Sequence, residues 1–234
     1  MIRIFADGAD LKQMIAARDS GVVNPDTTNP TLMRKAGVTN YRKFAREVLN
    51  EIPDMPISFE VFADTFKEME KQAMEIASWG ENVYVKIPIT NTQGLPTTPV
   101  IRHLSGNGVK VNVTAVLTLA QVKAAISHLS KETPSIVSVF AGRIADTGVD
   151  PRHIMFNSAC ETRLSEKPIQ CLWASCREAL NIIEADACTC DIITVPNDIL
   201  AKLPMFGKDL TELSLDTVKM FYNDAEASGY SVWE

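Results

Sequence analysis

The sequence alternates eight times between a short apolar stretch and a longer segment with the spacing of an amphipathic helix. The apolar stretches lie at residues 2–7, within 22–30, and at 57–61, 82–87, 109–114, 136–140, 169–175 and 191–195. Strands that alternate with helices predict βα units and a parallel sheet. Eight such units predict that the sheet closes into a (β/α)8 barrel, or TIM barrel. The alternative is an open doubly wound sheet, which usually carries fewer strands.

The helical segments complete the prediction of one α/β domain. They are expected at residues 9–18, 41–50, 65–78, 99–105, 119–129, near 151–163 and up to 187, with a short helix opening at Pro196 and an extra C-terminal helix at about 215–226. The sequence contains no Gly-x-Gly-x-x-Gly or Walker-type loop that would favour a nucleotide-binding sheet. Because 234 residues suit one barrel of this kind, we predict a single domain over residues 1–234.

Composition excludes several other classes of protein. The net charge of −6 argues against a nucleic-acid-binding surface. The first residues turn acidic too soon for a signal peptide, and no apolar run is long enough to span a membrane. Five cysteines without framework spacing predict reduced thiols, and Cys188 and Cys190 lack the further ligands of a zinc site. We therefore expect a cytoplasmic protein with no metal, nucleic-acid or membrane partner.

A single lysine, Lys86, lies inside the fourth apolar stretch. Side chains alternate along a strand, so Tyr84 and Lys86 share the face opposite to the neighbouring branched residues. Burial favours the neutral form of an amine, which is nucleophilic and condenses with ketones and aldehydes to a Schiff base. The alternative is a strand-end lysine whose ammonium group reaches solvent.

The same alternation places three more polar residues on the inner face of the predicted barrel. Asp7, Glu60 and Thr114 lie at or near the carboxyl ends of their strands, opposite the apolar face that a barrel strand turns to its helices. Taken singly, Asp7 could cap a helix, Glu60 could form an ion pair, and Thr114 could be an ordinary strand residue. Together with Lys86 they predict an active site, because Schiff-base chemistry needs groups that move protons.

A phosphate site is predicted after the sixth and seventh strands. Arg143 follows one strand end, and Ser175 and Arg177 follow the other. In barrels, the late βα loops commonly hold phosphate through helix N-termini and arginine. The alternative is that Ser175 caps a helix while both arginines are solvated.

Motifs that run through nearly the whole chain resemble one known family. They are Asp7, Thr-Thr-Asn-Pro at 27–30, Glu60, Lys-Ile-Pro at 86–88, Thr90, Gly94, Asn-Val-Thr at 112–114, Ser-Val-Phe-Ala-Gly-Arg at 138–143, Ala-Ser at 174–175, Arg177 and Asp-Ile-Ile-Thr-Val-Pro at 191–196. The pattern resembles the transaldolases, in particular their short subfamily, which also contains fructose-6-phosphate aldolases.

The resemblance implies a role for each matching residue. Lys86 would form the Schiff base, Asp7 would take the proton of the C4 hydroxyl, and Glu60 and Thr114 would hold a catalytic water. The implied substrate-binding residues are Asn29, Thr27, Asn112, Ser138 and Phe140. The implied phosphate-binding residues are Arg143, Ser175 and Arg177.

Two positions distinguish the activities within this family. Glu60 and Phe140 match transaldolases, whereas the aldolases carry glutamine and tyrosine there. A tyrosine hydroxyl could assist protonation of the dihydroxyacetone enamine, and phenylalanine cannot. Departures from the family pattern occur at Gly8, Pro25, Asp26, Trp173 and Cys176. If Trp173 faces inward, it would narrow the cavity.

The resemblance thus implies a transferase that passes dihydroxyacetone from a ketose phosphate to an aldose phosphate. It needs no cofactor, because the protonated imine is the electron sink. One alternative is an aldolase that releases free dihydroxyacetone, and another is a non-catalytic barrel that binds sugar phosphates. The resemblance also implies a homo-oligomer, a pentamer or decamer, in which the terminal helix reaches a neighbour. Packing of this helix on its own barrel is the alternative.

Overall fold

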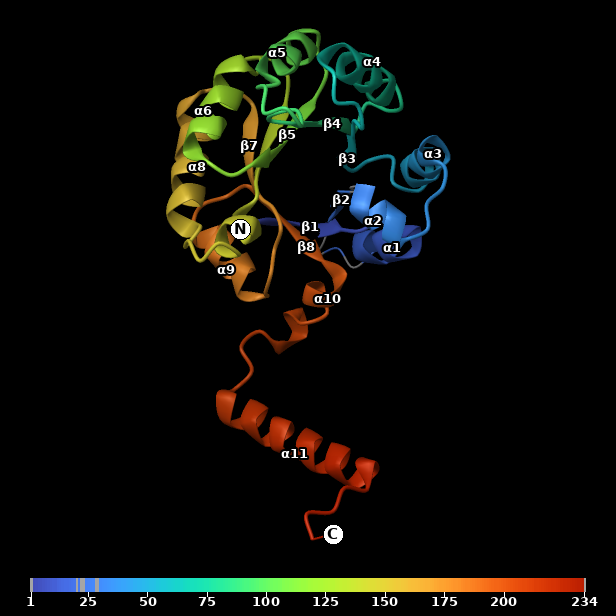
Figure 1. Cartoon of the computed structure of the whole chain (residues 1–234), viewed down its shortest axis with the longest axis vertical. Coiled ribbons are helices and arrows are strands. Elements are labelled where there is room, and N and C mark those ends of the chain that lie inside the picture. The colour runs from blue at the N-terminus through green and yellow to red at the C-terminus, as the bar shows by residue number, and fades with distance from the viewer. Residues whose placement is uncertain (1, 20, 22–23, 28–29, 234) are drawn as a thin grey trace. The chain divides into compact units, whose positions relative to one another are not determined.

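The structure is a computed structural model that describes residues 2–19, 21, 24–27 and 30–233. Within these residues eight strands pair in parallel, in chain order, and the last strand pairs with the first (Figure 1). The strands are β1 Arg3–Asp7, β2 Asn24–Thr27, β3 Ile57–Glu60, β4 Val83–Pro88, β5 Val111–Val116, β6 Ser135–Val139, β7 Ile169–Trp173 and β8 Ile192–Pro196. The predicted closed barrel is confirmed, and an open sheet is excluded.

Helices follow the strands and surround the barrel (Figure 1). The predicted ones are α1 Leu11–Asp19, α3 Tyr41–Glu51, α4 Phe66–Ala77, α5 Thr98–Gly106, α6 Leu119–His128, α8 Arg152–Leu164, α9 Leu180–Ala187 and α10 Asn197–Leu200. Two further helices, α2 Pro30–Lys35 and α7 Ala141–Ala145, were not predicted. Each is under two turns long, which is too short for a helical period to show in the sequence.

Local signals in the sequence explain where several helices begin. The Asn40 side chain accepts a hydrogen bond from the backbone N–H of Lys43 and so caps α3. At α6, Thr118 and Gln121 form a complete capping box. These caps satisfy N–H groups that would otherwise lack partners in the first helical turn, and so they fix where each helix starts behind its strand.

The barrel interior holds an apolar cluster and a group of hydrogen-bonded polar side chains. Phe5, Ile136, Leu172 and Ile192 form the buried apolar cluster with Ala174. In the polar group, Asn112 donates to the Ser58 hydroxyl at 3.1 Å and accepts from the Ser138 hydroxyl at 2.7 Å. Asn112 is also registered with Lys86 on the neighbouring strand, so the polar group lies beside the strand that carries this lysine.

Trp173 lies on the outer face of the barrel. Its registered neighbours are Val139 and Ile193, while Leu172 pairs with the inward-facing Ser138. The Trp173 side chain is 1% exposed, and its Nε1 has no hydrogen-bond partner among the described residues. The bulky side chain therefore packs towards the helices and does not narrow the cavity.

The chain divides into two compact units, residues 1–200 and residues 201–234. The second unit contains a short 3-10 turn, Leu203–Met205, and the helix α11, Leu210–Ser228. This helix is longer than the predicted 215–226, because Asp209 caps its start and Gly229, with a φ of 66°, ends it. Exposed apolar side chains along α11 include those expected to contact a neighbour: Leu215, Val218, Met220, Phe221 and Tyr222.

Candidate active site

Lys86 and Glu60 lie side by side on neighbouring strands. The register pairs Glu60 with Lys86, Lys86 with Asn112, and Pro88 with Thr114. Paired residues of adjacent parallel strands point to the same side of a sheet, and Asn112 is bonded inside the barrel. Lys86 and Glu60 therefore face the interior, close to the carboxyl ends of their strands, as predicted.

Burial shapes the chemistry of this pair. Lys86 is only 8% exposed, and its neighbours Val85 and Ile87 are fully buried on the opposite face of β4. Burial raises the pKa of the Glu60 carboxyl, and the charge of Lys86 opposes that rise. A carboxyl with a raised pKa beside an amine can exchange protons with a bound substrate near neutral pH.

Tyr41, from α3, fixes the backbone of Glu60. Its hydroxyl accepts a hydrogen bond from the Glu60 N–H at 2.7 Å and donates one to the Glu60 carbonyl at 3.1 Å. The Tyr41 ring packs in an aromatic group with Phe59, Phe62 and Trp79. Nothing in the sequence pattern indicated this role, because an aromatic residue at a helix start normally indicates core packing.

Thr114 is followed by a distortion of strand β5. Thr114 is 4% exposed, and Ala115 adopts a left-handed φ of 58°. The pairing register with β6 shifts between Val113 and Val116, as in a β-bulge. Bulges next to active sites commonly redirect a side chain, and here the distortion begins directly after Thr114.

The predicted phosphate-binding residues lie in two loops that touch each other. A Cβ atom on Gly142 would lie 1.7 Å from the carbonyl oxygen of Ser175, so only glycine allows this approach. Ser175 lies beyond the end of β7, with a φ of 63°, and does not cap α9, whose N-cap is Ala179. The structure therefore brings α7, which carries Arg143, against the loop of Ser175 and Arg177.

Both arginines are held by protein groups in this structure. Arg177 binds the Asp146 carboxylate at 2.5 and 3.1 Å, and this contact lowers the pKa of Asp146, with a smaller contribution from Arg143. The Arg143 guanidinium lies 5.7 Å from the centre of the Phe140 ring. A bound phosphate would compete with Asp146 for Arg177.

Other predicted site residues lie on β1, on β2 and in the polar group inside the barrel. Asp7 ends β1 and pairs with Thr27 and Pro196. Asn29 lies outside the described residues, and the structure describes only the backbone of Thr27. Asn112 and Ser138 lie in this polar group, where each already has a partner.

Cys176, another departure from the family pattern, is buried. Its thiol donates to the Glu178 carbonyl at 3.2 Å, and burial raises its pKa to about 11. A thiol with a raised pKa stays protonated and unreactive at neutral pH. Cys176 is therefore a packing residue in the loop that carries Arg177.

Two contacts that the sequence did not predict join the loops at the barrel mouth. Asp64 accepts hydrogen bonds from the backbone N–H and the hydroxyl of Thr92, at 2.7 and 2.8 Å. Gln72 accepts from the N–H groups of Phe62 and Ala63 at 2.8 and 2.9 Å. These contacts hold the segments that follow β3 and β4, and so the strand ends that carry Glu60 and Lys86.

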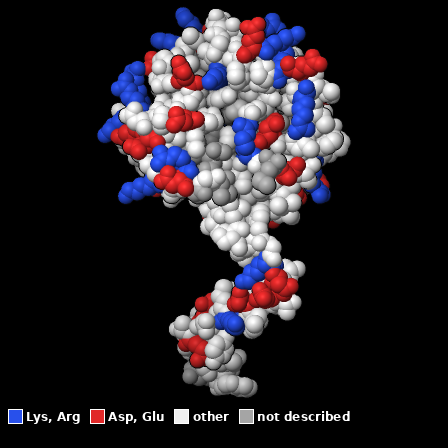
Figure 2. Space-filling view, turned by 180° about the vertical axis from the view of Figure 1, so that it is seen from behind, with Lys and Arg blue, Asp and Glu red and all other residues white. Residues whose placement is uncertain are grey.

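The surface and the helices add three observations. On the face of the barrel unit shown in Figure 2, acidic and basic side chains are interspersed. No group of side chains suited to a metal ion is found among the described residues. None of the helices formed by the described residues has the length and apolar character that crossing a bilayer requires.

The whole chain is similar to known proteins. Residues 4–232 match the family model described as transaldolase/fructose-6-phosphate aldolase. The chain belongs to this family. It is 34% identical, over 96% of its length and 97% of the relative's, to a protein of Chlorobium phaeobacteroides named probable transaldolase. It is 30% identical to one of the same name from Maridesulfovibrio salexigens, over 94% and 99% of the two chains. The predicted family is therefore confirmed.

Proposed function

We propose that this enzyme is a transaldolase that transfers a dihydroxyacetone unit through a Schiff base on Lys86. The donor would be a ketose phosphate such as sedoheptulose 7-phosphate or fructose 6-phosphate, and the acceptor glyceraldehyde 3-phosphate or erythrose 4-phosphate. This is the transfer of the non-oxidative pentose phosphate pathway. The observation that carries the proposal is the buried amine of Lys86 beside the carboxyl of Glu60, inside the barrel of a transaldolase-family chain.

The reaction begins when the Lys86 amine attacks the ketose carbonyl. The carbinolamine hydroxyl is protonated and leaves as water, which gives the imine. Glu60 and Thr114 hold the catalytic water through which this proton is delivered. Asp7 then takes the proton of the C4 hydroxyl, the C3–C4 bond breaks, and the bonding electrons move into the imine as an enamine. The shortened aldose phosphate leaves. The enamine attacks the acceptor aldehyde, Asp7 returns the proton, and water releases the new ketose and free Lys86.

Recognition of the phosphate group would fall to Arg143, Ser175 and Arg177. The close contact of Gly142 with Ser175 holds the two loops at a fixed distance, which suits one anion between them. Arg177 would exchange Asp146 for the phosphate, which is the stronger bidentate acceptor because of its charge. Asn29, Thr27, Asn112, Ser138 and Phe140 would line the sugar chain.

A fructose-6-phosphate aldolase is the alternative activity within the family. Phe140 favours transfer over release, because it offers no hydroxyl to help protonate the enamine. A barrel that binds sugar phosphates without catalysis is the second alternative, and the intact set of Asp7, Glu60, Lys86 and Thr114 argues against it. We further propose a single-domain cytosolic enzyme that assembles as a pentamer or decamer through the apolar side chains of α11.

Borohydride trapping tests the proposal. Intact mass after reduction with fructose 6-phosphate should show a dihydroxyacetone-sized adduct, which peptide mapping places on Lys86. The Lys86→Ala variant should show none. Erythrose 4-phosphate added before the reductant should discharge the adduct if the enzyme transfers. An adduct that persists with the acceptor favours the aldolase, and no adduct from any ketose phosphate leaves a binding barrel.

A further inference from the structure

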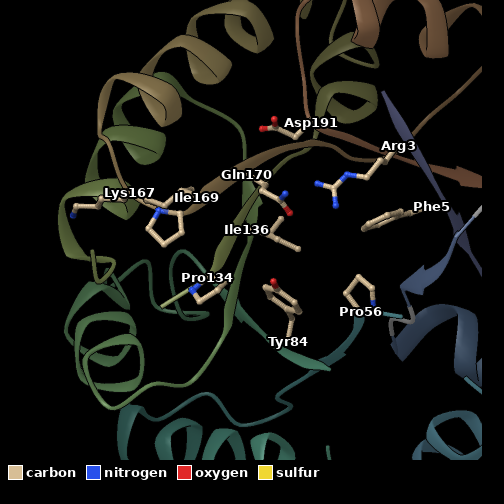
Figure 3. Close-up of a pocket in the computed structure, with 11 residues that line it drawn as sticks. Arg3, Phe5, Pro56, Tyr84, Pro134, Ile136, Lys167, Ile169, Gln170 and Asp191 are labelled. Atoms are coloured by element: carbon tan, nitrogen blue, oxygen red, sulfur yellow. The ribbon is translucent and has the colours of Figure 1, made fainter. Parts of the chain in front are cut away.

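A cavity opens at the opposite end of the barrel from Lys86. It has a volume of about 410 Å³ and is lined by residues at the amino ends of the strands, among them Arg3 on β1, Tyr84 on β4 and Gln170 on β7 (Figure 3). Its inner wall is made by Phe5 and Ile136 of the apolar cluster. None of the predicted site residues lines this cavity, so it is not part of the candidate active site.

Polar side chains from different strands converge on this cavity. In Figure 3 the Arg3 guanidinium and the Gln170 amide extend towards each other, and the Tyr84 hydroxyl faces the same space. The rim carries Pro56 and Pro134, whose rings are rigid apolar surfaces. Polar groups that converge beside rigid apolar surfaces can fix the orientation of a small molecule.

The Arg3 guanidinium has no carboxylate partner among the residues that the structure describes. It lies 5.7 Å from the centre of the Phe5 ring, which holds it in place by a cation–π contact. The nearby Asp191 carboxylate instead accepts the Cys171 N–H at 2.8 Å. The Gln170 side chain forms no hydrogen bond with the residues that the structure describes. An arginine held in this way can offer its paired N–H groups to an anion.

The other cations around the cavity are used differently. The Lys167 ammonium donates to the carbonyls of Ile126 and Leu129 at 2.6 and 2.7 Å, at the end of α6. Figure 3 shows it directed away from the cavity. The Lys110 ammonium donates to the Glu81 carbonyl at 2.6 Å and lies over the Tyr84 ring. Together with Arg3, these two cations outnumber Asp191, the carboxylate among the lining residues, so the local charge favours a negatively charged ligand.

We propose that this cavity binds a small organic oxyanion, with its phosphate or carboxylate group on Arg3 and Gln170 and its carbon skeleton against Pro56 and Pro134. Phosphate and carboxylate groups both present two oxygens that the paired N–H groups of one arginine can bind at once. The site is independent of the proposed catalytic chemistry. Its occupant would join β1 to β7, strands that are not neighbours in the barrel.

Calorimetric titration of the full chain tests this site with phenyl phosphate and benzoate as probes and neutral benzyl alcohol as the uncharged control. Phenyl phosphate should show two binding events in the wild-type protein, one at this cavity and one at the candidate substrate-phosphate site. Arg3→Gln should weaken the first event at least tenfold in Kd. Arg143→Gln should weaken the second event and leave the first unchanged. Benzoate binding that is lost in Arg3→Gln would show that carboxylates also occupy the cavity.

Two controls keep the result interpretable. Arg46→Gln removes an exposed arginine from α3 and should leave both events unchanged. Gln170→Leu should weaken the first event without changing the activity of the enzyme, even if Arg3→Gln proves unstable. The proposal is overturned if both probes bind Arg3→Gln and Gln170→Leu as they bind the wild type. Benzyl alcohol binding as tightly as the anions would also overturn it.

Discussion

The Tyr41 hydroxyl takes the place of a strand neighbour for Glu60. The Val61 N–H donates to the Lys86 carbonyl, so the backbone groups of Glu60 point the other way, towards β2. In the described residues β2 ends at Thr27, and Thr27 with Ser58 is the registered pair between β2 and β3. The Tyr41 hydroxyl binds the N–H and the carbonyl of Glu60, which lie beyond this short pairing. It thereby holds the strand end that carries the Glu60 carboxyl.

Replacing Tyr41 with phenylalanine should loosen Glu60. The change leaves two backbone groups without partners, which should cost about 1–3 kcal/mol of stability. We expect kcat to fall about tenfold with KM for the ketose little changed, because the phosphate-binding loops are untouched. Denaturant unfolding and steady-state kinetics measure the two effects. Tyr230→Phe, at a position 88% exposed, is the control and should change neither. An unchanged kcat in Tyr41→Phe would mean that the bridge only stabilises the fold.

The Glu60 carboxyl should make stability depend on pH. Burial raises its pKa in the folded protein, so the folded state binds the proton more tightly than the unfolded state. The stabilisation that this tighter proton binding gives the folded state is complete below the ordinary glutamate pKa of about 4.3. It is lost as pH rises through the raised pKa of Glu60 in the folded protein. Glu60→Gln should therefore gain stability relative to wild type as pH increases. Melting curves from pH 4 to pH 8 check this, and a constant difference would contradict it.

Gly142 should tolerate no side chain. The Cβ of alanine would overlap the Ser175 carbonyl oxygen, so Gly142→Ala must push the two loops apart. We expect KM for the sugar phosphate to rise at least tenfold and the melting temperature to fall. Gly106→Ala is the matched control, because its Cβ position at the end of α5 has no atom within 4 Å apart from the neighbouring backbone of the same helix. That variant should be neutral or more stable by up to about 1 kcal/mol.

The left-handed backbone at Ala115 should resist branched side chains. A non-glycine residue in this region costs about 1–2 kcal/mol, and branching at Cβ adds to the cost. Ala115→Val should lower the free energy of unfolding by about 1–2 kcal/mol, whereas Ala115→Gly should not lower it. Chemical denaturation of both variants distinguishes these results. Equal stability of the valine variant would mean that the backbone relaxes out of the bulge.

The period of two in the strands was enough to predict the inner face of the barrel. Because the strands are parallel and in chain order, residues near their carboxyl ends had to share one mouth. The nearness of Glu60 and Lys86 follows from that argument alone. The seventh strand was predicted to extend to Ser175, and this bound is wrong because β7 ends at Trp173. The apolar run in the sequence continues past this last paired residue.

Long-range polar contacts could not be predicted in the same way. The bond of Arg177 to Asp146 joins residues 31 positions apart, and no periodicity encodes it. The hydroxyl of Tyr41 meets Glu60 only because the start of α3 lies beside the end of β3. Such contacts depend on how elements pack, and a single sequence gives the packing only coarsely.

The pairing of β1 with β8 has a consequence for the order of folding. Residues 3–7 find their partners at residues 192–196, almost the full length of the barrel unit away. During synthesis β1 must wait until nearly every other strand has been made, and such non-local pairing is slow. Until then β1 has one unpaired edge, a template for aggregation. A nascent chain stalled before Ile192 is thus the species most in need of a chaperone.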